Sequence, residues 1–356
     1  MRDVFNLKNN QIILNDSNDI KRVYLELTNA CNFKCKMCFK NTFVEPEGYM
    51  SKETIKEVKK QLKELPQLKE VVVGGIGESL LHPEIKDILS FLKDELNVYV
   101  ILQTNGFLLG KFSRFVLDKK IDNIIVSVDN TDVGHLSNDL VYNTIKSIND
   151  KRLEEKRDKP VFSMEVVIDK YSLRGLDRTI KRFIEAGIKD VIISNLLPVN
   201  KSMTERTLYP SSDKDILKDV IKVAQGVISM TLPYFEIKTE RKCNFIDKKA
   251  LIVRWDGEVA PCYRFLHTAK EFVIGREKTI YAHTFGNVNR EHLLDIWNKR
   301  DYKWFRFIVD NAIYPSCIDC NFNESCDFVK DTAVDCWGNE PSCADCLWSR
   351  NIIICP

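Results

Sequence analysis

The sequence lacks an excess of either charge and lacks any long apolar run. Its 53 lysines and arginines nearly cancel its 51 aspartates and glutamates, so charge alone indicates no nucleic acid and no anionic membrane as the main partner. No stretch is long enough to span a bilayer. The first residues, MRDVFNLKNNQIILND, carry charges and asparagines where a signal peptide needs an apolar core. We therefore expect a cytoplasmic protein with no membrane partner.

Twelve cysteines are the unusual part of the composition. In a reducing compartment they cannot be presumed to form disulfides, so their spacing is tested first as metal ligation. A chain of 356 residues is long enough for a large α/β unit and a smaller second unit. We predict an N-terminal extension at 1–20, a barrel domain at 21–232 and a cysteine-rich α+β domain at 233–356.

Short β-branched runs alternate with amphipathic segments along the first two thirds of the chain. The expected strands are 23–28, 70–73, 98–103, 123–128, 162–168 and 190–194, and the expected helices are 51–65, 83–96, 111–119, 140–155, 172–186 and 213–230. Strict alternation favours parallel strands joined by right-handed crossovers. The fold class is therefore α/β, with a partial (β/α)6 TIM-like barrel whose chemistry lies at the carboxyl ends of the strands.

After Pro233 the character of the sequence changes. Residues 252–255 and 258–262 flank Asp256-Gly257, which predicts a β-hairpin. Nine of the twelve cysteines follow in about 115 residues with few long apolar runs. This composition is typical of a small module stabilised by bound metal.

The strongest local signal is a loop with three cysteines, Cys31, Cys35 and Cys38, directly after the first expected strand. Three thiolates can ligate three irons of a cubane cluster and leave the fourth iron without a protein ligand. The alternatives are a structural zinc site, which would need a fourth ligand nearby, and unrelated buried thiols.

At these residues the chain resembles the radical S-adenosylmethionine (radical SAM) superfamily, whose signature is Cys-x3-Cys-x2-Cys. The resemblance covers about residues 21–232 and implies a [4Fe-4S] cluster held by the three cysteines. It also implies S-adenosylmethionine on the open iron and reductive release of a 5′-deoxyadenosyl radical. The superfamily usually has an aromatic residue before the last cysteine, whereas this chain has Met37.

The same resemblance implies S-adenosylmethionine contacts at successive strand ends. A family Gly-Gly-Glu-Pro segment aligns with residues 76–79, so that only its Gly-Glu core is kept. The alternative for each position taken singly is a plain turn or a polar cap on a strand. The implied contacts are Gly77, Glu78, Thr104, Asn105, Ser127, Asp129, Lys170 and Leu197.

The C-terminal cysteines resemble the opening of the SPASM domain, which carries auxiliary [4Fe-4S] clusters. The matching positions are Cys243, Cys262, Cys317, Cys320 and Cys326, and the chain departs from the pattern with Cys336, Cys343, Cys346 and Cys355. Eight thiolates would hold two clusters and nine are present, so the ligand sets stay open. The rival interpretation is a zinc ribbon made by the Cys317-x2-Cys320 and Cys343-x2-Cys346 pairs.

The segments DCWGNEPSCADCLW and FGNV also resemble a narrower group, the radical maturases that accompany tungsten-dependent aldehyde oxidoreductases. This resemblance implies action on such an enzyme or on its tungstopterin cofactor, without choosing between them, and an electron donor such as ferredoxin or flavodoxin. A general acid or base cannot be named, because Glu165, Asp169 and the five histidines form no constellation. Two alternatives remain: a SPASM enzyme that modifies a peptide or a sulfatase, and a non-catalytic electron-transfer or zinc protein.

Overall fold

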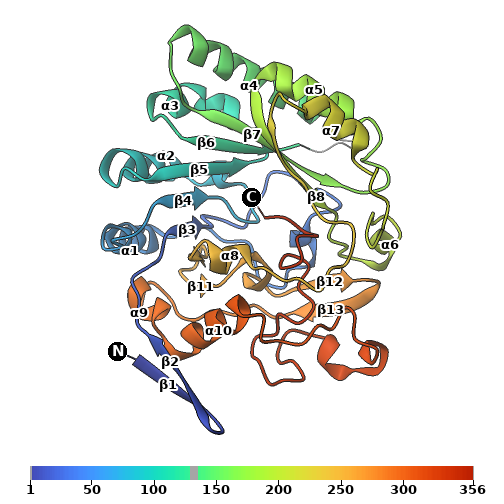
Figure 1. Ribbon diagram of the computed structural model, residues 1–356. Helices are drawn as coiled ribbons and strands as arrows, with labels where there is room; N and C mark the ends of the chain where they lie inside the picture. The colour runs from blue at the N-terminus through green and yellow to red at the C-terminus, as the bar shows by residue number, and fades with distance from the viewer. Residues whose placement is uncertain (1, 129–134, 356) are drawn as a thin grey trace.

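A nine-stranded, curved sheet organises the molecule (Figure 1). The computed structural model describes residues 2–128 and 135–355. Eight strands of this sheet are parallel to their neighbours, and β11 runs antiparallel to β10 at one edge. In sheet order they are β11 (Val259–Ala260), β10 (Ala250–Val253), β3 (Arg22–Leu25), β4 (Glu70–Val73), β5 (Tyr99–Thr104), β6 (Asn123–Ser127), β7 (Val161–Ile168), β8 (Ile188–Asn195) and β9 (Ser229–Thr231).

The helices that follow the strands cover the outer face of the sheet (Figure 1). The first begins after Ser51, whose hydroxyl accepts a hydrogen bond from the Thr54 amide, as an N-cap should. The partial barrel expected from the sequence is confirmed. Its helices are α1 (Lys52–Lys63), α2 (Ile85–Ser90), α3 (Ser113–Asp118), α4 (His135–Glu154), α5 (Leu176–Ala186), α6 (Lys201–Thr204) and α7 (Lys218–Ala224).

Each strand of the barrel has two buried faces, and the faces belong to different cores. Val71 and Leu102 lie in the large core between the sheet and the helices. Tyr24, Val72 and Ile101 instead fill the inside of the barrel, together with Phe245 and Tyr263 from the C-terminal part. Because neighbouring side chains along a strand point to opposite faces, polar residues at alternate positions near the strand ends reach the inside of the barrel.

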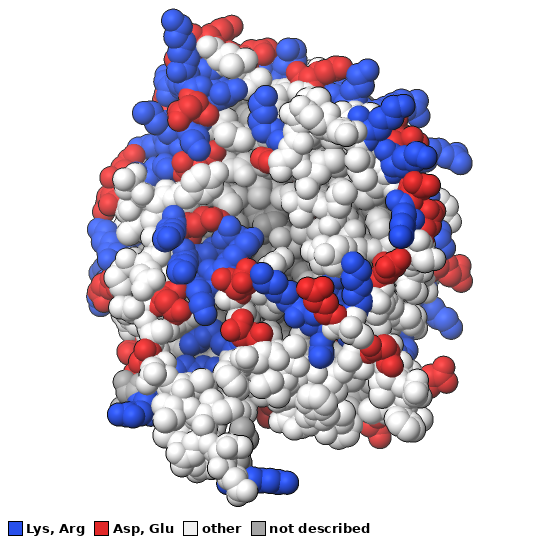
Figure 2. Space-filling model, in the orientation of Figure 1, with Lys and Arg blue, Asp and Glu red and all other residues white. Residues whose placement is uncertain are grey.

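The C-terminal part adds α8 (Asn244–Asp247), α9 (Leu293–Trp297), α10 (Arg300–Asp310) and a hairpin of β12 (Ala269–Val273) and β13 (Arg276–Ile280). The predicted hairpin at 252–262 is present as β10 and β11, and β10 also pairs with β3, so it extends the barrel sheet. No helix in the described residues is long and apolar enough to cross a membrane. Over the face drawn in Figure 2, acidic and basic side chains are interspersed and a hollow lies near the middle.

The end of the barrel domain and the N-terminal extension hold structure that the sequence-based expectation did not contain. The helix expected at 213–230 is shorter at both ends, as α7 covers only Lys218–Ala224. Gly226 adopts a left-handed conformation (φ 75°) after it, and residues 229–231 form β9. The N-terminal extension is an antiparallel hairpin of β1 (Arg2–Leu7) and β2 (Asn10–Asn15). Phe5 in this hairpin stacks on Trp304 of α10 with ring centroids 4.3 Å apart.

Candidate active site

The three-cysteine loop leaves β3 at the carboxyl end of the barrel strands and is fixed at its base. Thr28 donates its hydroxyl hydrogen bond to the Gly48 carbonyl (2.6 Å). Asn29 donates to the Pro46 carbonyl (3.0 Å) and accepts from the Gly48 amide (2.7 Å). These bonds bind the loop to the segment before α1, so its first residues cannot move independently of the barrel.

The three thiols of the loop are half-buried, and Cys31 lies close enough to Cys38 to interact with it electrostatically. The Cys38 amide donates to the Cys35 carbonyl (3.1 Å), which makes a tight turn between these two cysteines. Burial raises the pKa of Cys38, and the nearby Cys31 raises this pKa further. Cys31 accepts N–H···S hydrogen bonds from the Phe33 amide (3.5 Å) and the Asn105 side chain (3.8 Å). Such bonds stabilise a sulfur that carries negative charge, as a cluster ligand does.

Gly77 and Glu78 press directly against this loop. A Cβ atom at Gly77 would lie 2.3 Å from the Thr28 carbonyl oxygen and 2.5 Å from the Ala30 carbonyl oxygen, so only glycine fits. The Glu78 amide donates to the Ala30 carbonyl (2.8 Å). The loop after β4 therefore packs against the backbone that leads into the cysteine loop.

The buried Glu78 carboxylate accepts three hydrogen bonds from other parts of the protein. It accepts from the Leu80 amide (3.0 Å), the Thr104 hydroxyl (2.8 Å) and the Asn105 amide (2.7 Å). Burial raises the pKa of Glu78. Thr104 in turn accepts from the Gly106 amide (3.0 Å). Glu78 and Thr104 thus position the loop after β5, and Asn105 in that loop also donates to Asn32 (2.8 Å) beside the cysteines.

The remaining predicted S-adenosylmethionine contacts do not lie together at the cysteine loop. Ser127 ends β6 inside the barrel and donates a hydrogen bond to Glu165 of β7. Asp129 lies outside the described residues. Lys170 is exposed and donates to the Glu205 carbonyl (2.6 Å), and Leu197 packs against a cluster that includes Leu347 and Ile352 of the C-terminal part. The structure brings Gly77, Glu78, Thr104 and Asn105 together at the cysteine loop, but not Lys170 or Leu197.

Two polar sites in the barrel, Glu165 alone and the buried Glu26–His267 pair, were not predicted as a constellation. Burial raises the pKa of Glu165 to about 7. Farther along the barrel, both carboxylate oxygens of Glu26 lie 3.0 Å from His267 Nε2, and both side chains are fully buried. The available signal for Glu26 was a charged residue inside the strand expected at 23–28. Its partner lies 241 residues away, which no local pattern can indicate.

The C-terminal cysteines form two groups. In the inner group, Cys243, Cys262 and Cys355 pack against the core that fills the barrel and line one small pocket with Tyr263 and Trp348. Burial, with a smaller contribution from Cys346, raises the pKa of Cys243 to about 11. Cys343 lies near Cys346, Cys262 and Cys243, and these neighbours add to the effect of burial on its pKa. The inner group therefore has five members.

The outer group has four members and lies farther from the barrel. Burial raises the pKa of Cys317 to about 12, with contributions from Cys336 and Cys326. Cys336 is exposed, and partial desolvation raises its pKa, with further contributions from Asp335, Cys326 and Cys320. A zinc ribbon would pair Cys317 and Cys320 with Cys343 and Cys346, but the thiols are grouped differently.

The candidate metal ligands of this chain are free cysteine thiols. All twelve cysteines lie in the described residues, and none forms a disulfide. Within 2–128 and 135–355, no three His, Cys, Asp or Glu side chains converge closely enough to hold one metal ion. Cysteine thiolates are the ligands that hold [4Fe-4S] clusters, and this chain has three on the loop after β3 and nine in its C-terminal part. The chemistry of these donors fits iron–sulfur clusters.

Comparisons with known proteins agree with this geometry. The family model of the radical SAM superfamily matches residues 25–209, and that of SPASM, an iron–sulfur cluster-binding domain, matches residues 243–321. A protein of Pyrococcus furiosus named tungsten-containing aldehyde ferredoxin oxidoreductase cofactor-modifying protein is 39% identical over 347 residues, covering 95% of this chain and 97% of the relative. A probable GTP 3′,8-cyclase of Methanococcus maripaludis is 33% identical over 114 residues, covering 32% of this chain and 38% of the relative.

Solved structures share the fold at low sequence identity. The structure of anSMEcpe with bound AdoMet has a TM-score of 0.59 at 18% identity and covers 86% of this chain and 84% of its own. SuiB of Streptococcus suis bound to S-adenosylmethionine has a TM-score of 0.58 at 15% identity and covers 87% and 73%. The combination of a radical SAM domain with a SPASM domain implies [4Fe-4S] clusters and S-adenosylmethionine as cofactors. The chain belongs to the radical SAM superfamily, as a radical SAM/SPASM protein closely related to a tungsten-enzyme cofactor-modifying protein.

Proposed function

We propose that this chain is a maturase that cleaves S-adenosylmethionine at a cluster held by Cys31, Cys35 and Cys38. The observation that supports it is the placement of three thiols on one loop at the barrel mouth, while the other nine cysteines lie at Cys243 and beyond. When bound, the cluster and S-adenosylmethionine supply the one-electron cleavage that gives a 5′-deoxyadenosyl radical.

The residues around the loop hold this site in one geometry. Gly77 allows the backbone after β4 to pack against the cysteine loop. Glu78 holds the loop after β5 in place by accepting hydrogen bonds from Thr104 and Asn105. Asn105 then donates to Cys31 and Asn32. We assign Gly77, Asn105 and Ser127 to the S-adenosylmethionine pocket, with Glu78 and Thr104 as positioning residues.

The substrate is a tungsten-dependent aldehyde oxidoreductase or its tungstopterin cofactor. The support for this assignment is the full-length relative, which is named as modifying the cofactor of such an enzyme. A low-potential donor such as ferredoxin or flavodoxin would reduce the cluster, in the cytoplasm, where thiols stay reduced.

The first experiment measures 5′-deoxyadenosine after anaerobic reconstitution and dithionite reduction. Wild-type protein should form it from S-adenosylmethionine, and Cys38→Ala should not, while keeping the iron of the C-terminal part. The matched control is Cys320→Ala, which should lose outer iron and still form 5′-deoxyadenosine. Wild-type protein that carries iron yet forms no 5′-deoxyadenosine would refute the enzymatic proposal.

A second experiment identifies the substrate. The reduced protein and S-adenosylmethionine are incubated with a tungsten oxidoreductase, and the polypeptide and released pterin are analysed separately by mass spectrometry. We expect a mass change in the pterin or in the polypeptide that is absent with Cys38→Ala. A change in neither, with turnover on a short peptide instead, would favour a peptide-modifying enzyme.

A further inference from the structure

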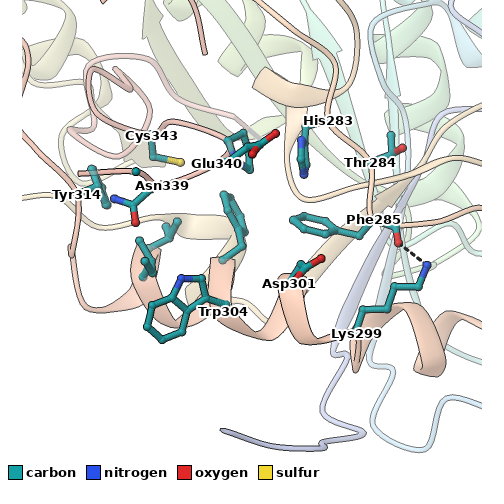
Figure 3. Close-up of a pocket in the computed structure, with 15 residues that line it drawn as sticks. His283, Thr284, Phe285, Lys299, Asp301, Trp304, Tyr314, Asn339, Glu340 and Cys343 are labelled. Carbon is teal, nitrogen blue, oxygen red and sulfur yellow. Dashed lines mark hydrogen bonds between the residues drawn. The ribbon is translucent and has the colours of Figure 1, made fainter. Parts of the chain in front are cut away.

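The three histidines of the C-terminal part have different surroundings. The His267 side chain is fully buried and lies against the buried Glu26 of the barrel. His283 lines a cavity of about 570 Å³ (Figure 3), and His292 is partly exposed beside Glu64 on the surface. His267 is therefore the histidine of this part whose ionic partner is closed to solvent.

The Glu26 carboxylate holds the His267 ring by its Nε2 atom. Both carboxylate oxygens lie 3.0 Å from Nε2. A carboxylate only accepts hydrogen bonds, so Nε2 is the donor and carries a ring proton. Glu26 also accepts from the Ile76 amide (3.4 Å), and a Cβ atom at Gly75 would lie 2.7 Å from the Glu26 Cγ. The carboxylate is therefore enclosed by the loop after β4 on one side and by His267 on the other.

The face of the same ring contacts the far end of the cysteine loop. The Phe43 ring stacks on His267 with centroids 4.5 Å apart and an angle of 29° between the planes. Glu26 lies five residues before Cys31, and Phe43 lies five residues after Cys38. One imidazole therefore contacts the chain on both sides of the three cysteines.

The backbone beside His267 makes the same connection. The Val44 amide donates to the Thr268 carbonyl (3.2 Å), and the Thr268 amide donates to the Glu45 carboxylate (2.8 Å). The Lys270 amide donates to the Thr42 hydroxyl (3.1 Å). The end of the cysteine loop is therefore attached to the start of β12.

The segment that carries His267 is itself held by the C-terminal part. The Arg254 guanidinium donates to the Leu266 carbonyl (3.0 Å). The His283 amide donates to the Phe265 carbonyl (2.9 Å). His267 therefore cannot move away from Glu26 unless this backbone moves with it.

We propose that His267 is a positioning residue for the N-terminal site, which holds the two ends of the cysteine loop through Glu26 and Phe43. The C-terminal part then acts on this site through one ring, although it supplies none of the three thiols of the loop. The inference rests on the proposed function only in taking the loop to hold a cluster. It requires the loop to be ordered by His267 before any iron is bound.

Two amide substitutions separate the hydrogen bond from the rest of the side chain. In His267→Gln the amide nitrogen stands as far along the side chain as Nε2 does, so it can still donate to Glu26. The side chain of His267→Asn is shorter and does not reach. It leaves a buried carboxylate without its donor, which is costly.

Hydrogen–deuterium exchange of the iron-free full chain measures the order of the loop. His267→Asn should speed amide exchange at residues 31–38 and 39–45 by about tenfold or more. His267→Gln should restore slow exchange at residues 31–38. Exchange in β4 and β5 should stay as in wild-type protein in both variants.

Anaerobic reconstitution supplies a spectroscopic readout. His267→Asn should lose the electron paramagnetic resonance signal of the N-terminal cluster, and the change of this signal on adding S-adenosylmethionine, while it keeps the auxiliary iron. His292→Asn is the matched control, because it removes a surface contact of 2.9 Å with Glu64 and leaves a residue that can still cap α9. It should match wild-type protein in both measurements.

Slow exchange of residues 31–38 in His267→Asn, or fast exchange there in His267→Gln, would overturn the inference. If His267→Asn also speeds exchange in β4 and β5, the whole barrel has opened and Phe43→Leu decides: faster exchange confined to residues 39–45 supports the link, and unchanged exchange overturns it. A wild-type chain that binds no iron at Cys31, Cys35 and Cys38 would refute the proposed function, whereas the exchange of the iron-free chain decides the role of His267.

Discussion

At the scale of single residues, the candidate site depends on Gly77, because this position has no room for a side chain. Gly77 lies against the carbonyls of Thr28 and Ala30, and these residues lead into the first cysteine. The glycine was predicted as a ligand contact, but its place in the structure shows a second role. It allows the loop after β4 to pack against the cysteine loop. The sequence alone cannot predict this contact between two backbone segments.

Gly77→Ala should displace the cysteine loop. The added methyl would overlap backbone oxygens that cannot rotate away, which should cost roughly 1–3 kcal/mol in the free energy of unfolding. We expect loss of the N-terminal cluster with the C-terminal iron retained, measured by iron analysis and electron paramagnetic resonance. Gly110→Ala is the control, because its Cβ would meet Thr144 alone, at 3.7 Å. Equal iron content in both variants would contradict the role given to Gly77.

Glu165 should make stability depend on pH near neutrality. Burial raises its pKa from 4.5 to about 7, so the folded protein holds a proton that the unfolded chain has already released. The stabilising contribution of this proton is present below pH 4.5 and is lost as the pH rises through 7. Compared with Glu165→Gln, wild-type protein should therefore lose on the order of 1–2 kcal/mol of unfolding free energy across this range.

Anaerobic urea denaturation at several pH values measures this difference. Glu185→Gln, an exposed position on α5, serves as the control and should follow wild-type protein at every pH. If the unfolding free energies of wild-type protein and Glu165→Gln change with pH in parallel, the pKa of Glu165 is not raised in the folded protein.

At the scale of elements, strands with buried β-branched runs were predictable and hairpins between polar residues were not. β4, with Val71, Val72 and Val73 all fully buried, coincides with its prediction. The hairpin of β12 and β13 escaped because its turn uses Ile274 at φ 48° before Gly275, and isoleucine is no turn signal. Pairing of β10 with β3 could not be predicted either, since no local pattern joins strands so far apart in the chain.

The β12–β13 hairpin is joined to the cysteine loops by a buried network of charges. Arg264 donates to Glu271 (2.5 Å) and to Asp345 (3.0 Å), and Lys278 lies 3.1 Å from Asp345. Burial opposes the charge on Asp345, but the two cations hold its pKa below the usual value. Arg264 and Lys278 together therefore favour the charged form of Asp345.

Arg264→Ala should therefore be strongly destabilising. It leaves Glu271 and Asp345 buried without their shared guanidinium, which typically costs about 3–5 kcal/mol. Thermal and urea unfolding followed by circular dichroism would measure this loss. Arg114→Ala is the control, because Arg114 makes its ion pairs on the surface with 63% of its side chain exposed, and such pairs contribute little. A similar small effect for both variants would contradict the role of the network.

At the scale of the whole molecule, the two parts of the chain share one sheet and one core. β10 covers the edge of β3, and Phe245 and Tyr263 fill the barrel from the C-terminal side. The predicted boundary after residue 232 stays a prediction. Across that boundary, Ile354 donates to Ser194 (3.0 Å) and Asn195 donates to the Ile352 carbonyl (3.1 Å), so the last turns of the chain are bound to β8.

Truncation after residue 232 should not give a stable barrel. It would expose the unpaired edge of β3 and the apolar residues inside the barrel, and exposed edges promote aggregation. We expect insoluble protein, or aggregates by size-exclusion chromatography. Deletion of residues 1–15 removes a hairpin whose strands pair with each other alone, and this shorter chain should stay folded. A monomeric, folded 1–232 fragment would show that the barrel is independent.

The buried charges of Arg264, Lys278 and Asp345 lie between the inner and outer cysteine groups and interact electrostatically with both. Arg264 is close to Cys346 of the inner group, and Lys278 is close to Cys317 of the outer group. Asp345 contacts both cations. If each thiol group held a cluster, a change of charge at one would alter the electrostatic field at the other, because buried charges are weakly screened. The reduction potentials of the two auxiliary sites should therefore be set jointly, and a substitution beside one of them should shift both.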